Sequence, residues 1–347
     1  MFLKKTLIIF IVATLGCFAL MAQSTAGDRS FAVLNLYNSA QMTARGLNFI
    51  PRFVNDVPTA ITNPSTLNDS LNNKVSLTYT DLFAGAYQGA LAFTHKFDKL
   101  NNFGNFGFGL QYINYGNFTQ TESDGEVTGS FLVNDFMLTV GWGMQLEKNL
   151  YIGATFKPLF SQYESYSSFA IAFDLAATYV SNDKSWQAAF MIKNVGRQLV
   201  SFNNERDTLP FDMQIGVSKR FTHAPLILYI VADKLTKWNI RENDVLNPRD
   251  VTQIDGTVDE ENDFSAFLDK GFRHLHFAVD IVPSDKFYIS LGYSWRQHQE
   301  MKVDDAFSLA GFSYGLGIKY KKYTLNYARN EYHNYGSPNY LTLGYNF

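Results

Sequence analysis

The sequence closes on Tyr340-Leu341-Thr342-Leu343-Gly344-Tyr345-Asn346-Phe347, and this stretch decides the fold class. Apolar and polar residues alternate along it, and its last residue is aromatic. Alternation with a period of two is typical of a β-strand with two different faces. A strand with one apolar face and an aromatic end is typical of an outer-membrane β-barrel, in which lipid covers one face and the lumen lies behind the other.

The opposite end of the chain has the features of an export signal. Lys4 and Lys5 precede an apolar run, Leu7–Met21, and the small residue Ala22 follows it. This order predicts a secretory signal peptide over residues 1–22, cut after Ala22. The run is too short for a membrane helix, which needs about 20 apolar residues. We therefore expect the mature chain to cross a membrane as a barrel.

Composition favours a membrane barrel over a soluble domain. The chain of 347 residues has 31 Phe, 20 Tyr and 24 Gly, and only 18% of its residues are charged. Aromatic residues suit the lipid-facing band and the interfacial girdles of a barrel. The formal net charge of −3 gives no reason to expect nucleic acid as a partner. The one cysteine, Cys17, lies in the predicted signal; a lipid anchor on Cys17 is a less favoured alternative.

Fourteen alternating runs follow residue 73, with turn residues between them. Within Leu150–Lys157, for example, the even-numbered positions are apolar and the odd-numbered ones are tyrosine, glycine, threonine and lysine. Fourteen is an even number, as single-chain bacterial barrels normally require. The predicted strands are Lys74–Asp81, Tyr87–Phe97, Gly104–Phe118, Ser130–Leu146, Leu150–Tyr163, Ser167–Val180, Ser185–Val195, Phe211–Phe221, Leu226–Thr236, Arg273–Val282, Phe287–Arg296, Phe307–Lys321, Lys322–Arg329 and Asn339–Phe347.

The connections between these runs alternate in length. Every second connection is short, such as Glu147–Asn149. Outer-membrane barrels have short periplasmic turns and longer external loops, so the alternation predicts the orientation, with the C-terminus at the periplasmic rim. The long, external connections are Thr119–Gly129, Gly196–Leu209, Lys237–Phe272, Gln297–Ala306 and Asn330–Pro338.

The predicted domain organisation has three parts. The signal covers residues 1–22, and residues 23–73 form an irregular segment that we expect to enter the barrel as a hatch or plug. The barrel covers residues 74–347, with its longest extracellular loop at about 237–272. The fold class is therefore all-β membrane: a 14-stranded antiparallel outer-membrane β-barrel. A soluble lipocalin-like barrel is the less favoured alternative, because it has fewer strands.

No arrangement of residues predicts an enzyme. His274 and His276 share a face of a predicted strand, as two metal ligands would, but no third ligand accompanies them. The acidic residues from Glu242 to Asp269 lack the spacing of a calcium loop, which favours a solvated loop or a partner contact. The glycines of Gly104–Gly109 lie in a predicted strand and not at a strand–helix turn, so they predict no phosphate site. We expect no catalytic residue, no metal and no cofactor.

Several segments resemble known families. Ala44-Arg45-Gly46, Asn55-Asp56 and Asn63-Pro64-Ser65-Thr66-Leu67 resemble the hatch of barrels related to the FadL long-chain fatty-acid transporter, where an Asn-Pro-Ala/Ser-x-Leu sequence precedes the first strand. Gly109–Gly116 and, above all, Leu209–Pro225 resemble the PorQ family of the type IX secretion system.

This resemblance implies a FadL-like barrel in the outer membrane that is not itself a catalyst. PorQ-like proteins anchor a PorZ-like surface protein in a complex with a PorU-like sortase and a PorV-like barrel. That complex matures secreted cargo and attaches it to anionic lipopolysaccharide. The alternatives are a FadL-type channel for hydrophobic small molecules, a PorV-like cargo shuttle, or a component that anchors the secretion rotor.

An anchor needs an external surface that a protein can bind. Aromatic residues are enriched in interface cores, and the predicted external loops contain several. Phe264 and Phe267 lie three apart within Asp263–Leu268, so a short helix there would put both on one apolar face. Such a face either binds a partner or packs on the mouth of the barrel. The residues that we predict to bind the partner are Trp238, Phe264, Phe267 and Phe272.

Overall fold

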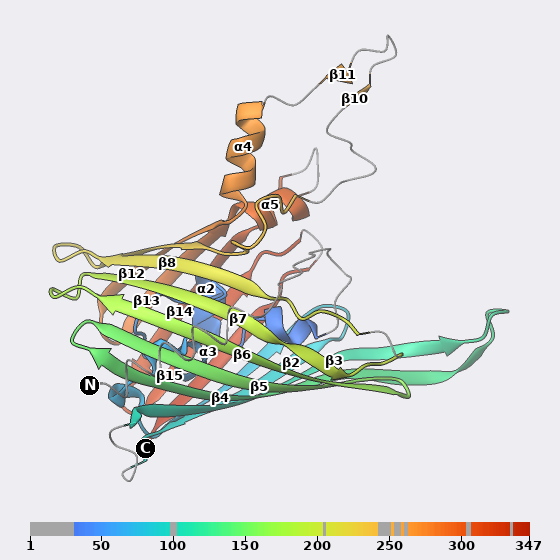
Figure 1. The fold of residues 1–347 in the computed structure, drawn as a ribbon, viewed down its shortest axis with the longest axis horizontal. Coiled ribbons are helices and arrows are strands. Elements are labelled where there is room, and N and C mark those ends of the chain that lie inside the picture. The colour runs from blue at the N-terminus through green and yellow to red at the C-terminus, as the bar shows by residue number, and fades with distance from the viewer. Residues whose placement is uncertain are drawn as a thin grey trace, which may run out of the picture.

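The structure is a computed structural model. It describes residues 31–97, 103–203, 206–241, 251–252, 258–259, 263–302, 307–333 and 336–347, with the side chains of the stretch from 251 to 263 excepted. In this part of the chain, a closed antiparallel barrel has the strand order β1-β16-β15-β14-β13-β12-β9-β8-β7-β6-β5-β4-β3-β2 (Figure 1). The prediction of a 14-stranded antiparallel barrel is confirmed.

Each barrel strand corresponds to one of the predicted runs, with small differences at the ends. The bounds are β1 (Lys74–Asp81), β2 (Tyr87–His95), β3 (Asn105–Thr121), β4 (Val127–Glu147), β5 (Leu150–Tyr163), β6 (Tyr166–Val180), β7 (Trp186–Val200), β8 (Asp212–Arg220), β9 (Leu226–Ala232), β12 (Leu275–Ser284), β13 (Phe287–Ser294), β14 (Phe312–Tyr320), β15 (Tyr323–Asn330) and β16 (Asn339–Asn346).

The last strand closes the barrel by pairing with the first. β16 lies antiparallel to β1, in a register that places Lys74 opposite Asn346 and Asp81 opposite Asn339. Ladder pairing therefore continues around the whole circuit, so neither strand leaves a free edge. Closure of this kind is what permits strands to cross lipid, because an open edge would leave backbone groups without partners.

The predicted alternation gives the wall two chemically different faces. In β1, Ser76, Thr78 and Thr80 are buried toward the lumen, whereas Leu77 and Tyr79 on the outer face are 54% and 53% exposed. The same contrast recurs around the barrel, whose outer surface is rich in exposed leucine, isoleucine and aromatic side chains. An apolar outer belt of this extent fits contact with lipid and not with water.

One side of the barrel is taller than the rest and slightly taller than predicted. The expected loop over Thr119–Gly129 is too long by three residues at each end, because β3 continues to Thr121 and β4 begins at Val127. Cross-strand pairing continues into this region, and Phe118 and Phe131 stack there with ring centroids 5.6 Å apart. Crossing a membrane takes about 9–11 residues per strand, whereas β3 and β4 have 17 and 21. The β3–β4 hairpin therefore extends well beyond the other strands (Figure 1).

On the opposite side, a helix interrupts two predicted strand ends. The expected strand Phe287–Arg296 ends at Ser294, and the expected strand from Phe307 begins only at Phe312. Between them lies α5 (Trp295–Met301). The Ser294 side chain accepts a hydrogen bond from the backbone of Gln297 at 3.3 Å, which caps this helix and ends the strand.

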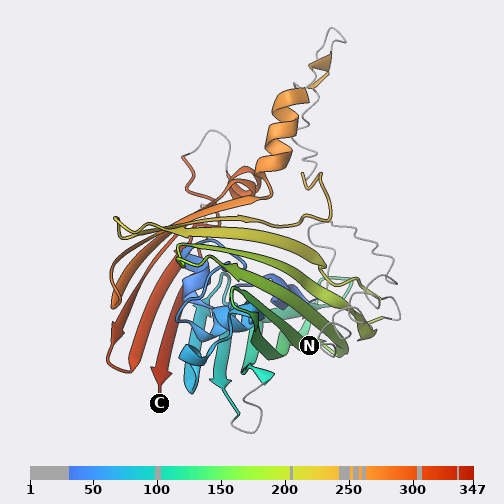
Figure 2. The same cartoon turned by 60° about the vertical axis from the view of Figure 1, so that its left-hand side comes forward.

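The longest external connection contains a second helix, α4 (Asp263–Phe272), and a two-stranded pair, β10 (Val251–Thr252) with β11 (Val258–Asp259). The hypothesis of a helix that carries Phe264 and Phe267 is confirmed. α4 stands out from the barrel, at the end opposite the C-terminus (Figures 1 and 2). No helix in the described ranges is long and apolar enough to cross a membrane.

The segment of residues 31–73, called the hatch here, lies inside the barrel. Figure 2 shows its short helices, in blue, surrounded by strands. Local sequence explains where the two α-helices begin, since Ser39 and Asp56 accept hydrogen bonds from the first turns. The elements are η1 (Ala32–Asn35), α2 (Ala40–Ala44), α3 (Val57–Thr62), η2 (Pro64–Thr66) and η3 (Asp69–Leu71).

Glycines on the inner wall make room for the hatch backbone. A methyl group added at Gly143 or Gly153 would collide with the backbone of Pro64 in η2. One added at Gly292 on β13 would collide with the carbonyl group of Arg45. The lumen-facing glycines are thus contact points at which the hatch and the wall meet without side chains between them.

We predict that Gly292→Val destabilises the barrel, because its Cβ alone would collide with the Arg45 carbonyl oxygen and the two methyl groups add to this crowding. Overpacking of this kind costs about 1–3 kcal/mol in the free energy of unfolding, which urea titration of the barrel in lipid vesicles measures. Gly89→Val is the matched control, since a Cβ there meets nothing within 4 Å. Equal losses in both variants would show that strand glycines matter for reasons other than hatch contact.

Candidate functional site

A buried ion pair joins the hatch to the barrel wall. Arg45 follows α2 and is 3% exposed, and its Nη2 and Nε lie 2.6 and 3.1 Å from Oδ2 of Asp280 on β12. Tyr229 donates to the same carboxylate at 2.8 Å, and Ser290 donates at 2.6 Å. Strands β9, β12 and β13 therefore share one hydrogen-bond network with the hatch. Buried charges are tolerated in proteins only with such complete pairing.

Aromatic rings complete the surroundings of this arginine. The Arg45 guanidinium lies 5.4 Å from the ring centroids of both Tyr229 and Tyr288. Its Nη1 also donates to the carbonyl of Gln41 at 2.7 Å. Arg45 is thus held by charge, by aromatic faces and by its own helix, which leaves it little freedom to move.

The Asn-Pro-Ser stretch that resembles the FadL-type hatch is a second attachment point. Asn63 donates from its side chain to the carbonyl of Ile50 at 2.9 Å, which ties two hatch segments together. The Ser65 and Thr178 hydroxyls are 2.7 Å apart, and Thr178 belongs to β6 of the wall. The residues behind the sequence resemblance therefore dock the hatch on the tall side of the barrel.

Asp56 organises the hatch from within. It is 3% exposed and accepts hydrogen bonds of 2.5 Å from the hydroxyls of both Ser39 and Thr59. Burial raises the pKa of the Asp56 carboxyl above its ordinary value, and the hydrogen bonds from Ser39 and Thr59 oppose that rise. The helices α2 and α3 are held together through this one carboxyl group.

Little open space remains between the hatch and the middle of the wall. A cavity of about 40 Å³ lies there, lined from the hatch side by Tyr37 and Met42 and from the wall by Lys157 and Asp174. The last two form an ion pair of 2.7 Å and are both buried. A space of this size and polarity suits water molecules and not an apolar ligand.

The two histidines singled out in the sequence have structural contacts. Both nitrogens of His274 face backbone carbonyls, those of Asp233 at 2.8 Å and Trp238 at 3.1 Å. His276 lies 3.2 Å from the Asp233 carboxylate, which also binds Arg296 at 2.8 and 2.9 Å. Within the described ranges, no three His, Cys, Asp or Glu side chains are arranged to hold a metal ion.

The predicted partner-binding aromatics lie together on one external surface. The ring centroids of Trp238 and Phe267 are 5.4 Å apart, and those of Phe272 and Trp295 are 6.0 Å apart. Trp238, Phe267 and Phe272 line a shallow cavity of about 380 Å³, while Phe264 lies outside its lining and is 70% exposed. Leu235, Leu268 and Leu275 also line it. They were missed in the sequence, because single apolar residues near strand ends or within a helix give no distinct signal.

Ion pairs fix the base of α4. Asp269 binds Arg241 at 2.7 Å and Arg273 at 2.9 Å, and it accepts a hydrogen bond from the Trp295 indole at 2.8 Å. Arg273 also lies 3.5 Å from Glu300 on α5. One member of the predicted acidic connection therefore has a structural role. The side chains from Glu242 to Asp263 lie outside the described residues, so the structure does not test them.

The comparisons with solved structures concern the fold. The toluene transporter TodX of Pseudomonas putida has a TM-score of 0.53 and 12% sequence identity, with 90% of this chain and 97% of that chain covered. A mutant of the TodX monoaromatic hydrocarbon channel has a TM-score of 0.54 and 11% sequence identity, with 89% of this chain and 99% of that chain covered. A FadL homologue of Pseudomonas aeruginosa has a TM-score of 0.51 and 11% sequence identity, with 89% of this chain and 98% of that chain covered. No family model matches the chain, and no curated protein matches it.

At these identities the similarity shows the fold alone, and that fold is a FadL-like outer-membrane β-barrel. The prediction of this fold class is confirmed. The finer resemblance to the PorQ family stays a prediction, because none of these three barrels tests it.

We predict that Asp280→Asn strongly destabilises the folded barrel, because it leaves the Arg45 charge buried without a counter-ion. Loss of one partner of a buried pair costs about 3–5 kcal/mol in the free energy of unfolding. Asp69→Asn is the control: its ion pair with Lys96 has a similar distance of 2.7 Å but is exposed, so the expected cost is below about 1 kcal/mol. Similar losses in the two variants would contradict the special role of the buried pair.

Proposed function

We propose that this protein is a non-catalytic outer-membrane barrel that anchors a partner protein at the cell surface. The observation that carries the proposal is the external surface around α4, where Trp238, Phe267 and Phe272 gather beside one cavity. The apolar outer wall supports placement in a membrane, and the fold supports the outer membrane.

Three properties of the α4 surface suit a protein partner. Trp238, Phe264 and Phe267 are 54%, 70% and 56% exposed, although they lie beyond the strand ends. Large aromatics at an exposed site are typical anchors of protein interfaces, and polar groups such as those of Asp269 and Arg273 border them. The ion pairs at the base of α4 hold this surface in place before any partner arrives, which lowers the entropy cost of binding.

The hatch supports an anchor more than a channel. It is fixed by the buried Arg45–Asp280 pair, by Ser65 on Thr178 and by close backbone contact with wall glycines. Opening a path would break all of these contacts together. We further propose that the hatch plugs the lumen permanently.

The resemblance to the PorQ family names the partner. On this proposal, the α4 surface binds a PorZ-like protein, in a complex with a PorU-like sortase and a PorV-like barrel. The barrel then holds its partner where cargo is matured and attached to anionic lipopolysaccharide. A PorV-like cargo shuttle is a related alternative that would bind cargo in place of a PorZ-like protein.

A pull-down of the tagged protein from outer membranes in mild detergent, followed by mass spectrometry, tests the partner. We expect a PorZ-like protein, with the sortase and the PorV-like barrel, to co-purify with the wild type. Deletion of Arg241–Asp269 should abolish this capture, and Phe264→Ser with Phe267→Ser should reduce it at least tenfold, as loss of interface hot spots does. Phe307→Ser is the matched control, because Phe307 is an external aromatic that is 87% exposed on another loop.

Each other result of the pull-down has a definite meaning. Recovery of the folded barrel alone would contradict the anchor. Recovery of secreted cargo without a PorZ-like protein would favour the shuttle. Equal losses in the α4 variant and in Phe307→Ser would place the contact elsewhere.

A channel for hydrophobic small molecules is the second candidate, and the fold comparisons favour it. Two of the similar structures are described as a toluene transporter and a monoaromatic hydrocarbon channel. On this alternative, the hatch must move to open a path through a lumen that is closely packed in the structure.

A disulfide between hatch and wall separates the two candidates. Ser65→Cys with Thr178→Cys replaces hydroxyls 2.7 Å apart, and the predicted mature chain has no other cysteine. We expect this lock to leave partner capture unchanged and to have no effect on the accumulation of labelled toluene by cells. Uptake that falls with the lock and recovers on reduction, with Ser65→Cys alone as control, would favour the channel.

A further inference from the structure

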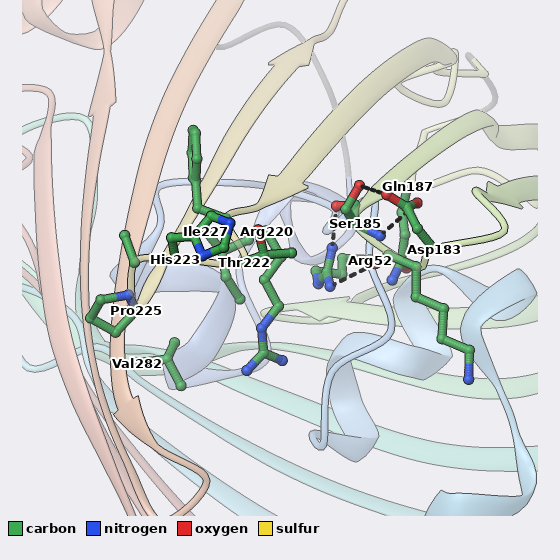
Figure 3. Close-up of a pocket in the computed structure, with 13 residues that line it drawn as sticks. Arg52, Asp183, Ser185, Gln187, Arg220, Thr222, His223, Pro225, Ile227 and Val282 are labelled. Atoms are coloured by element: carbon green, nitrogen blue, oxygen red, sulfur yellow. Dashed lines mark hydrogen bonds between the residues drawn. The ribbon is translucent and has the colours of Figure 1, made fainter.

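A third cavity opens at the end of the barrel opposite α4, among the short turns. Its volume is about 640 Å³, within the range of about 300–1,000 Å³ that is common for ligand sites. The β6–β7 turn contributes Asp183–Ser185, the β8–β9 turn contributes Thr222–Pro225, and the hatch contributes Arg52 (Figure 3). In the orientation predicted from loop lengths, this is the periplasmic mouth of the lumen.

Two arginines from distant parts of the sequence meet in this mouth. Arg52 is 7% exposed, and its guanidinium donates to the carbonyls of Lys184 and Ser185 at 3.3 and 3.4 Å. Arg220 is the last residue of β8 and lies on the lumen side, because Gly216 and Ser218 before it are buried there. Figure 3 shows both side chains among the residues that line the cavity.

Positive charge exceeds negative charge among the residues that line the mouth. Burial lowers the pKa of Arg52, and the nearby positive charge of Arg220 lowers it further. Both remain charged, since arginine does not lose its proton in proteins. Among the described residues, no carboxylate forms an ion pair with Arg52 or Arg220. Lys184 adds a third positive charge at the rim.

Acidic groups nearby are few. Asp183 also lines the cavity, and hydrogen bonds from the hydroxyls of Ser181 and Ser185 hold its pKa at about 2, so it contributes one negative charge. An adjoining cavity of about 220 Å³ shares Arg52 and Arg220. The lining of this adjoining cavity contributes two more positive charges, Lys286 and Lys319, and one negative charge, Asp285. Arg45 and Asp280 also line it, but they form an ion pair with each other.

We propose that this mouth, built around Arg52 and Arg220, is a binding site for carboxylates of an acidic peptide segment from a soluble periplasmic protein. Two guanidinium forks match the planar geometry of carboxylates, and the volume is larger than one small ion needs. Arg220 faces the lumen and not the outer wall, so a lipid headgroup in the surrounding membrane does not reach it. The site gives the barrel a contact on the face opposite α4.

The test uses the purified full-length barrel in detergent and fluorescein-labelled hexaglutamate as the probe, with fluorescence anisotropy as the readout. We expect saturable binding at about 0.15 M salt that weakens at about 0.5 M, whereas labelled hexaglutamine does not bind. Arg220→Gln should weaken hexaglutamate binding about tenfold, because a charge-assisted hydrogen bond is lost. Arg52→Gln should do the same, and Lys148→Gln, on the exposed β4–β5 turn, is the matched control.

Heat-modifiable migration on gels confirms that each variant is folded before it is used. Arg220 is exposed at the end of β8. Arg220→Gln therefore still tests the proposal if Arg52→Gln does not fold. Binding that is equal in Arg220→Gln and the wild type, or lost equally in Lys148→Gln, would overturn the proposal. Binding of pyrophosphate without binding of hexaglutamate would overturn the peptide assignment.

Discussion

Pairing of β16 with β1 closes the barrel, and the other features of the structure depend on this closure. Lipid offers no hydrogen bonds to a backbone, so every strand must have a neighbour on both sides where it crosses the membrane. Closure around fourteen strands then leaves a lumen lined by Ser, Thr, Asn and Gln. Such an interior must hold water or be filled by a polar segment. The hatch lies inside it, and its buried polar groups pair with those of the wall.

The packing inside the barrel follows from this filling. Backbone of the hatch approaches backbone of the wall at Gly143, Gly153 and Gly292, because any side chain there would hold the two apart. This close approach buries charged groups, which require partners. Arg45 and Asp280 pair with each other, and Tyr229 and Ser290 donate hydrogen bonds to the Asp280 carboxylate. Movement of the hatch would expose or separate these groups, which is the physical basis for the proposal of a fixed hatch.

Sequence patterns revealed the wall better than the interior. Alternation along each strand predicted all fourteen strands, and β1 and β5 have the bounds that were expected. The outermost three residues of β3 and of β4 were missed, because polar residues such as Thr119 and Gln120 gave the tip of the hairpin the pattern of a loop. Trp238, Phe267 and Phe272 were predicted and lie together, but the meeting of Arg52 with Arg220 was not, since contacts between distant residues leave no local pattern.

Low identity with similar structures is the expected result for such a fold. The outer wall needs only apolar side chains at alternate positions, and many sequences meet that condition. The shared fold, with TM-scores above 0.5, is therefore compatible with an identity of only 11–12%. Specific function is determined by the parts that these requirements do not constrain, which are the hatch, the loops and the two mouths of the barrel. The proposals for the α4 surface and for the arginine-lined mouth of this chain therefore rest on the chemistry of their own residues.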